Sequence, residues 1–140
     1  MSQRLRQLMQ ICQQGDIEIL YVFGSRSLEV YDWLHSDQPL AASSSDIDIG
    51  AKALPTAQWY LDEKVRLAQA FEELFAVPRV DFVSFGDADA FFAANIVRGE
   101  RLYAANEHAA DEFDLYVLRR AGDLAPFERE RLDHVFGVMQ

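Results

Sequence analysis

Two aspartates, Asp46 and Asp48, stand one residue apart in the apolar segment "SDIDIG" (residues 45–50). Alternate side chains of a strand point to the same face, so we expect both carboxylates on one face while Ile47 and Ile49 pack on the other. Neighbouring carboxylates repel each other unless a cation lies between them, and magnesium prefers oxygen ligands. The pair predicts either a metal-dependent phosphate site or an exposed acidic strand.

A third carboxylate, Asp81, lies in the apolar segment "RVDFV" (residues 79–83). A buried unpaired carboxylate is costly, so an aspartate among apolar neighbours is difficult to explain as an ordinary surface residue. We expect Asp81 to complete, with Asp46 and Asp48, a set of carboxylates that ligate two magnesium ions. Two such metals activate an attacking hydroxyl and hold the leaving group in phosphoryl transfer.

The segment "FGSR" (residues 23–26) provides candidates for the phosphate end of this site. Gly24 lets the backbone approach a ligand closely, and Ser25 together with the amides of a following helix can hold phosphate oxygens. Arg26 is a candidate for a further phosphate contact. Most Gly-Ser pairs after a strand are ordinary turns, and that alternative stays open here.

The elements that must position these residues alternate between helices and strands. Strands are predicted over residues 17–23, 45–53, 79–85 and 100–104. Helices are predicted over residues 2–14, 56–77 and 87–97, the last capped by Asp87, followed by a helical pair over 107–120 and 126–136 that Gly122 and Pro126 separate. This pattern predicts an α/β or α+β fold with a small mixed sheet flanked by helices.

The helix predicted over residues 56–77 carries apolar side chains at helical spacing. They are Leu61, Val65, Ala68, Phe71 and Phe75. We expect this stripe to cover one face of the sheet.

Composition limits the kinds of function. The 140 residues are expected to form a single domain (1–140), and no uncharged run approaches the length of a membrane span, which favours a cytoplasmic protein without membrane contact. The net charge of −10 argues against direct binding of nucleic acid and favours a basic protein partner. The lone Cys12 is expected to be a small core side chain.

The segments "FGSR", "SDIDIG" and "VDFV", followed by "IVRGERLYA" (residues 96–104), together resemble one known family. They are similar to the minimal nucleotidyltransferases of the DNA polymerase β-like superfamily, small antitoxins to HEPN-domain toxins. The resemblance covers roughly residues 8–104, and a helical tail over 105–140 is in keeping with it. It implies a polymerase β-like nucleotidyltransferase core.

The resemblance also implies roles for particular residues. Gly24 and Ser25 match the phosphate-side motif, Asp46 and Asp48 match the metal ligands, and Asp81 matches the third carboxylate. The implied reaction is magnesium-dependent transfer of AMP from ATP to a tyrosine hydroxyl of the partner toxin, which silences its ribonuclease activity. Two alternatives remain: a nucleotidyltransferase that acts on a small-molecule hydroxyl, and a non-catalytic module that neutralises a toxin by binding it.

The chain departs from the family pattern between Ser25 and Asp46, where the connecting segment is longer than family members usually carry. We expect a lengthened helix followed by a loop, with residues 36–45 mobile in the absence of nucleotide because they are small or polar. Tyr31 and Trp33 are expected to pack in the core rather than to stack on a base.

Overall fold

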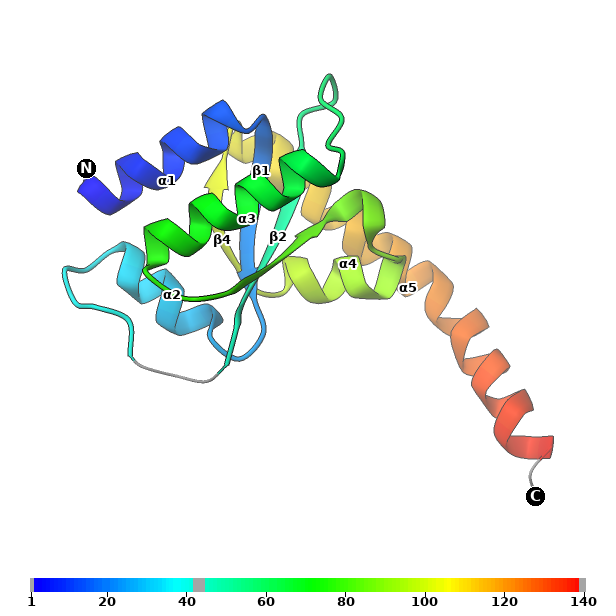
Figure 1. The fold of residues 1–140 in the computed structure, drawn as a ribbon. Coiled ribbons are helices and arrows are strands. Elements are labelled where there is room, and N and C mark those ends of the chain that lie inside the picture. Colours follow the sequence, from blue (N-terminus) through cyan, green and yellow to red (C-terminus); the bar gives the residue numbers. More distant parts are fainter. Residues whose placement is uncertain (1, 42–44, 139–140) are drawn as a thin grey trace.

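Four strands form one mixed sheet in the computed structural model, which describes residues 2–41 and 45–138. The spatial order is β3-β2-β1-β4, with β2 parallel to β3 and β1 antiparallel to both of its neighbours (Figure 1). The strands are β1 (Ile17–Phe23), β2 (Ile47–Ala53), β3 (Val80–Ser84) and β4 (Glu100–Ala104). The predicted mixed sheet is confirmed, and β4 is an edge strand as expected.

The central strand β1 is apolar because both of its faces are covered. Leu20 and Val22 belong to one core cluster, whereas Ile19, Tyr21 and Phe23 belong to a second cluster on the opposite face. This division follows the two-residue period of a strand. It explains why residues 19–23 of β1 form a continuous hydrophobic run rather than an alternating one.

Helices α1 (Gln3–Gln14), α2 (Ser27–Leu34) and α3 (Leu61–Phe75) contribute side chains to the first cluster. Cys12 is fully buried there, which confirms its predicted role as a core side chain. The predicted start of α3 at residue 56 is wrong. The helix begins at Leu61, and the carboxylate of Glu63 accepts a hydrogen bond of 2.9 Å from the backbone amide of the N-cap residue Tyr60.

The apolar stripe predicted on α3 is also partly wrong. Phe71 and Phe75 are buried as expected, but Leu61 and Val65 are exposed and Leu67 is buried in their place. Because successive residues turn about 100° around a helix, Val65 lies nearly opposite Leu67.

The second face of the sheet is covered by the short 3₁₀ helix η1 (Phe85–Asp87), α4 (Ala90–Val97) and α5 (Glu107–Val138). The predicted cap of α4 at Asp87 is wrong. Asp89 caps the helix by accepting a hydrogen bond of 2.8 Å from the backbone amide of Phe92, while Asp87 pairs with Lys64 at 2.6 Å. The cap must directly precede the first helical turn, and residues 85–87 form their own turn before it.

The predicted pair of C-terminal helices is wrong, because α5 is one continuous helix of 32 residues with Pro126 inside it. Proline removes the amide that would bond to the carbonyl of Gly122, four residues earlier. Among the described residues, no atom outside the backbone of α5 comes within 4 Å of the position where a Cβ at Gly122 would lie, so this side of the helix is open to solvent. The helix extends well beyond the sheet (Figure 1). Among the described residues, no helix is long and apolar enough to cross a membrane.

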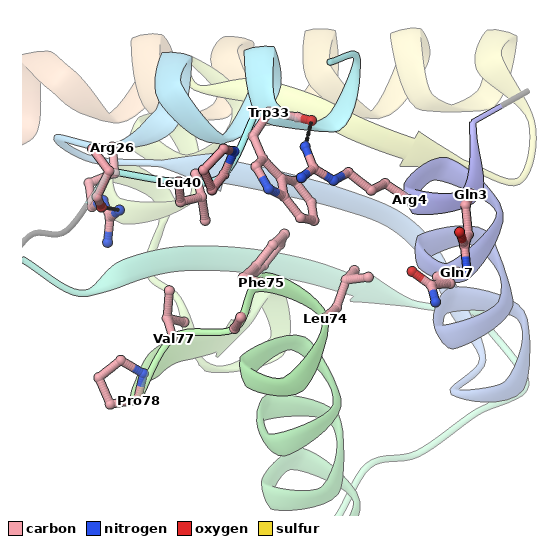
Figure 2. A pocket seen from close by; sticks show the side chains of 13 residues that line it. Gln3, Arg4, Gln7, Arg26, Trp33, Leu40, Leu74, Phe75, Val77 and Pro78 are labelled. Carbon is pink, nitrogen blue, oxygen red and sulfur yellow. Dashed lines mark hydrogen bonds between the residues drawn. The ribbon is translucent and has the colours of Figure 1, made fainter. Parts of the chain in front are cut away.

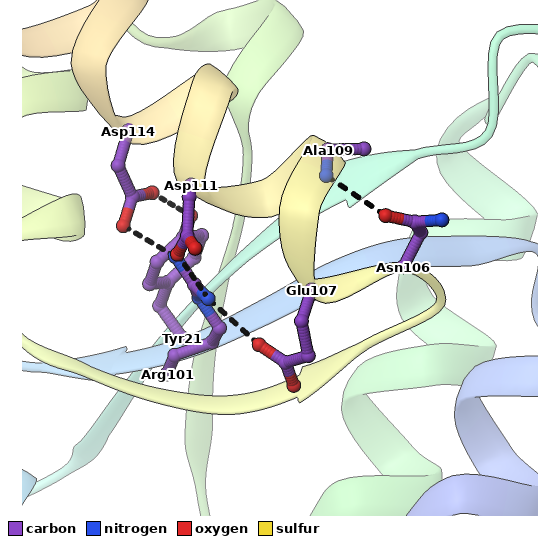
Figure 3. A network of polar contacts seen from close by, with 7 residues as sticks. All are labelled: Tyr21, Arg101, Asn106, Glu107, Ala109, Asp111 and Asp114. Atoms are coloured by element: carbon purple, nitrogen blue, oxygen red, sulfur yellow. Dashed lines mark hydrogen bonds and ion pairs between the residues drawn. The ribbon is translucent and has the colours of Figure 1, made fainter.

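A polar network fixes the first half of α5 to the sheet (Figure 3). Arg101 of β4 pairs with Glu107 at 2.8 Å, Asp111 at 3.0 Å and Asp114 at 2.7 Å. The hydroxyl of Tyr21 donates to the same Asp114 carboxylate. Burial, together with the bond to Asp114, raises the pKa of Tyr21 well above its usual range, so this hydroxyl stays a donor at physiological pH.

Candidate active site

Two of the predicted carboxylates lie side by side on neighbouring strands. Asp48 of β2 is in register with Asp81 of β3 in the parallel pair, and Asp48 is opposite Phe23 of β1 on its other side. The pKa of Asp48 lies above its usual range because the group is partly buried and because Asp81 and Asp46 place negative charge and a hydrogen-bonding carboxylate near it. The site therefore concentrates negative charge and favours a positive partner.

The third predicted carboxylate, Asp46, directly precedes β2 and shares a cation with Asp81. The guanidinium of Arg79 lies between them, with Nε 3.5 Å from Asp46 Oδ2 and Nη2 3.5 Å from Asp81 Oδ1. Sequence reasoning missed Arg79. A signal was present, because Arg79 precedes Asp81 by the same two residues that separate Asp46 from Asp48.

Gly24 connects the turn after β1 with this acidic group. Its φ is +79°, and a Cβ built on it would lie 2.4 Å from the Oδ2 atom of Asp48. Glycine is the residue that adopts this conformation without strain and leaves room for the carboxylate. The structure thus brings the predicted phosphate-side turn and Asp48 into direct proximity, with Ser25 next to Gly24 and exposed to solvent.

Arg26 is buried and is used to hold the long connection between α2 and β2. Its guanidinium pairs with Glu29 through bonds of 2.9 and 3.1 Å, and it donates to the carbonyl of Ala41 at 3.0 Å and of Ser45 at 3.1 Å. These bonds compete with the predicted contact between Arg26 and phosphate. That contact stays a prediction.

A second arginine, Arg4 of α1, holds the earlier part of the same connection. Its Nη1 donates to the carbonyls of Trp33, Ser36 and Gln38 at 2.8–2.9 Å. These bonds restrain the N-terminal part of the predicted mobile segment 36–45, of which residues 42–44 lie outside the described residues. The mobility stays a prediction.

The aromatic side chains of α2 differ in their surroundings. Trp33 is buried, packs edge-on against Phe75 and lies under the Arg4 guanidinium, as predicted for a core residue. The same expectation is wrong for Tyr31, which is exposed and contacts the ring of His35. A helix with one face on the core leaves residues two positions apart on different sides.

A cavity of about 700 Å³ lies beside this connection rather than at the aspartates (Figure 2). Its walls come from α1, from residues 39–41 and from the C-terminal end of α3 with the turn after it. Arg26 is the only predicted site residue that lines it, and Asp46, Asp48 and Asp81 do not. We therefore regard the acidic group of Asp46, Asp48 and Asp81, at the N-terminal ends of the parallel strands β2 and β3, as the candidate active site.

Within residues 2–41 and 45–138, no group of three or more His, Cys, Asp or Glu side chains is arranged as a metal site. The three aspartates share a charge environment, but only Asp46 and Asp81 have a cation between them, which is Arg79. Chemically, the arrangement provides several carboxylate oxygens, a glycine turn open to a ligand and an exposed hydroxyl. This set is suited to binding a cation together with an anionic ligand.

A family model described as Polymerase beta, Nucleotidyltransferase matches residues 6–108. This range contains the glycine turn, all three aspartates and Arg79. No curated protein matches the sequence.

Solved structures share the fold at low sequence identity. A chain of the toxin–antitoxin MntA–HpeT, in a variant with two aspartates replaced by glutamate, matches with a TM-score of 0.71 and 17% identity over 94% of this chain and 98% of that chain. A toxin–antitoxin with AMP-PNP matches with a TM-score of 0.71 and 18% identity over 94% of this chain and 98% of that chain. A chain from a complex of tri-AMPylated HEPN toxin with MNT antitoxin from Shewanella oneidensis matches with a TM-score of 0.67 and 17% identity. The match covers 95% of this chain and 96% of that chain.

Proposed function

Because the chain belongs to the polymerase β nucleotidyltransferase family, we propose that it transfers AMP from ATP to a tyrosine hydroxyl of a HEPN-type ribonuclease toxin and thereby acts as an antitoxin. The observation that carries the proposal is the register of Asp48 with Asp81 beside the Gly24 turn. The relatives add support, since one contains AMP-PNP and another a HEPN toxin that carries AMP groups.

Magnesium is the proposed metal, because the three aspartates offer the oxygen ligands that it prefers. Asp46, Asp48 and Asp81 offer carboxylate oxygens at one edge of the sheet. The pKa of Asp48 is raised by burial and by the negative charge of Asp81 and Asp46, and a divalent cation would balance that charge. When bound, magnesium would offset charge on the triphosphate and on the departing pyrophosphate. In one of the solved relatives, a toxin–antitoxin variant, two aspartates are replaced by glutamate. Aspartate is also the residue type that we assign to the metal in this chain.

Gly24 and Ser25 are proposed to hold the phosphates of ATP. The positive φ of Gly24 exposes backbone next to Asp48, and helix α2 begins shortly afterwards at Ser27. The N-cap residue Arg26 provides no side-chain hydrogen bond to the first turn of α2. Backbone amides at a helix N-terminus can bind an anion.

Asp81 is proposed to accept the proton of the attacking tyrosine. This hydroxyl has an ordinary pKa of about 10 and is protonated at neutral pH. As its oxygen bonds to the α-phosphorus of ATP, the bond from that phosphorus to the β-phosphate oxygen breaks, pyrophosphate leaves and the proton passes to the carboxylate of Asp81. Asp81 suits this role because it lies beside Asp48 at the open edge of β3.

The proposed partner presents a basic surface to this chain, whose net charge is −10. Attraction between opposite surfaces mainly accelerates encounter and weakens as salt screens it. We propose no direct contact between this chain and nucleic acid, and we place the reaction in the cytoplasm.

Magnesium-dependent release of pyrophosphate in the presence of a candidate HEPN partner tests the proposal. We expect release only when ATP, magnesium and the partner are all present. Release with a small-molecule hydroxyl in place of the partner would favour a small-molecule nucleotidyltransferase. Inhibition of the toxin without any release would favour a binding module.

A further inference from the structure

Arg79 occupies the position between two of the proposed metal ligands. In the parallel pair of β2 and β3, Ile47 is in register with Val80. One residue earlier on each segment, Asp46 and Arg79 form an ion pair, and the same guanidinium reaches Asp81. A single planar cation therefore contacts two carboxylates, one directly before β2 and one on β3.

The two contacts of Arg79 are those of an ion pair that another cation can replace rather than of one that stabilises the fold. Both nitrogen–oxygen distances are 3.5 Å, which is long for a charged hydrogen bond, and the Arg79 side chain is 69% exposed. Exposed ion pairs of this kind contribute little to stability. The buried Arg26, in contrast, makes four bonds of 2.9–3.1 Å with its surroundings.

We propose that Arg79 is an exchangeable counter-ion, which holds the carboxylates of Asp46 and Asp81 together before metal binds and must be displaced for both to ligate a divalent cation. The inference rests on the proposed role of these aspartates as metal ligands. Arg79 is then a positioning residue. It keeps like charges close at the edge of the sheet and lowers the affinity of the free site for metal.

Calorimetric titration of magnesium into the protein without nucleotide tests this role. Replacing Arg79→Gln removes the competing charge, so we expect magnesium to bind roughly threefold to tenfold more tightly, the range for loss of one or two exposed charge contacts. Arg79→Lys keeps the charge but loses the planar fork, and its affinity should lie between the two. Arg119→Gln, on the exposed side of α5, makes the same change in net charge and should match the wild type.

A thermal unfolding measurement in chelator gives a second readout. Arg79→Gln should lower the Tm slightly without metal, because three carboxylates then repel without compensation, and magnesium should restore it. Magnesium affinity in Arg79→Gln equal to or below that of the wild type would overturn the inference, as would absence of magnesium binding by both proteins. Failure of AMP transfer with these metal affinities intact would contradict the proposed function alone.

Discussion

Asp48 and Asp81 stand in register on two parallel strands, so their carboxylates project from the same face of the sheet at the same edge. Residues more than thirty positions apart in the sequence are brought together in this way. Parallel pairing of β2 with β3 is possible because α3 crosses over between them. The site is thus a direct consequence of the topology.

Asp48→Asn is expected to reduce the affinity for magnesium with ATP by at least about tenfold, because a neutral amide replaces a charged ligand. The variant should fold normally and should not lower the Tm in chelator, since burial and its neighbours disfavour the Asp48 charge. Titration of magnesium–ATP into both proteins measures the change. Equal affinities would show that Asp48 is not a ligand.

Gly24→Ala is expected to impair nucleotide binding. The new Cβ would lie 2.4 Å from Asp48 Oδ2 at a residue with φ of +79°, and this strain should cost about 1–2 kcal/mol of stability. Gly122→Ala is the matched control, because no described atom outside the backbone of α5 lies within 4 Å of the new Cβ and alanine should stabilise α5 by up to about 1 kcal/mol. Unchanged ATP affinity in folded Gly24→Ala would show that the segment at Gly24 and Ser25 is an ordinary turn.

Glu29→Gln tests the ion pair between Arg26 and Glu29, which holds the connection between α2 and β2. The bond from Arg26 lowers the pKa of Glu29 in the folded protein, so the pair stabilises the fold above the unfolded pKa of about 4.3 and loses this effect as pH falls through the lower folded value. Because the Glu29 side chain is 33% exposed, we expect a loss of only about 1 kcal/mol at pH 7. Urea unfolding of both proteins should show this difference shrinking below about pH 4, and a difference independent of pH would contradict the mechanism.

Asp114→Asn is expected to destabilise the attachment of α5 by about 1–3 kcal/mol, since Arg101 and Tyr21 both depend on this carboxylate. Asp111→Asn is the control, because Asp111 also pairs with Arg101 but its side chain is 68% exposed compared with 24% for Asp114. It should cost less than about 0.5 kcal/mol. Chemical denaturation compares the two variants, and equal losses would refute the anchoring role of Asp114.

Local patterns in the sequence were sufficient to predict the sheet. The strand predicted over residues 17–23 matches β1, and the predicted membership of the polymerase β-like nucleotidyltransferases is confirmed by the family model. The prediction failed where tertiary structure outweighs local preference. Gly122 and Pro126 predict a break, but the exposed backbone around Gly122 tolerates the lost hydrogen bond and α5 continues.

Contacts between distant segments account for what sequence reasoning missed at the site. Arg4 binds carbonyls about thirty residues away, and Tyr21 reaches Asp114 across the sheet, so no local spacing reports either contact. Arg26 follows the glycine turn and looks like a phosphate ligand, yet the folded chain provides Glu29 and two carbonyls that bind its guanidinium.

The mass of an intact HEPN partner after incubation with ATP and magnesium shows whether this chain transfers AMP to it. We expect the wild-type protein to add the mass of one or more AMP groups. Asp81→Asn should still bind the partner and much of its ATP but lose transfer by orders of magnitude, because the proton of the attacking hydroxyl has no acceptor. No added mass with the wild type, or equal addition with Asp81→Asn, would contradict the proposed reaction.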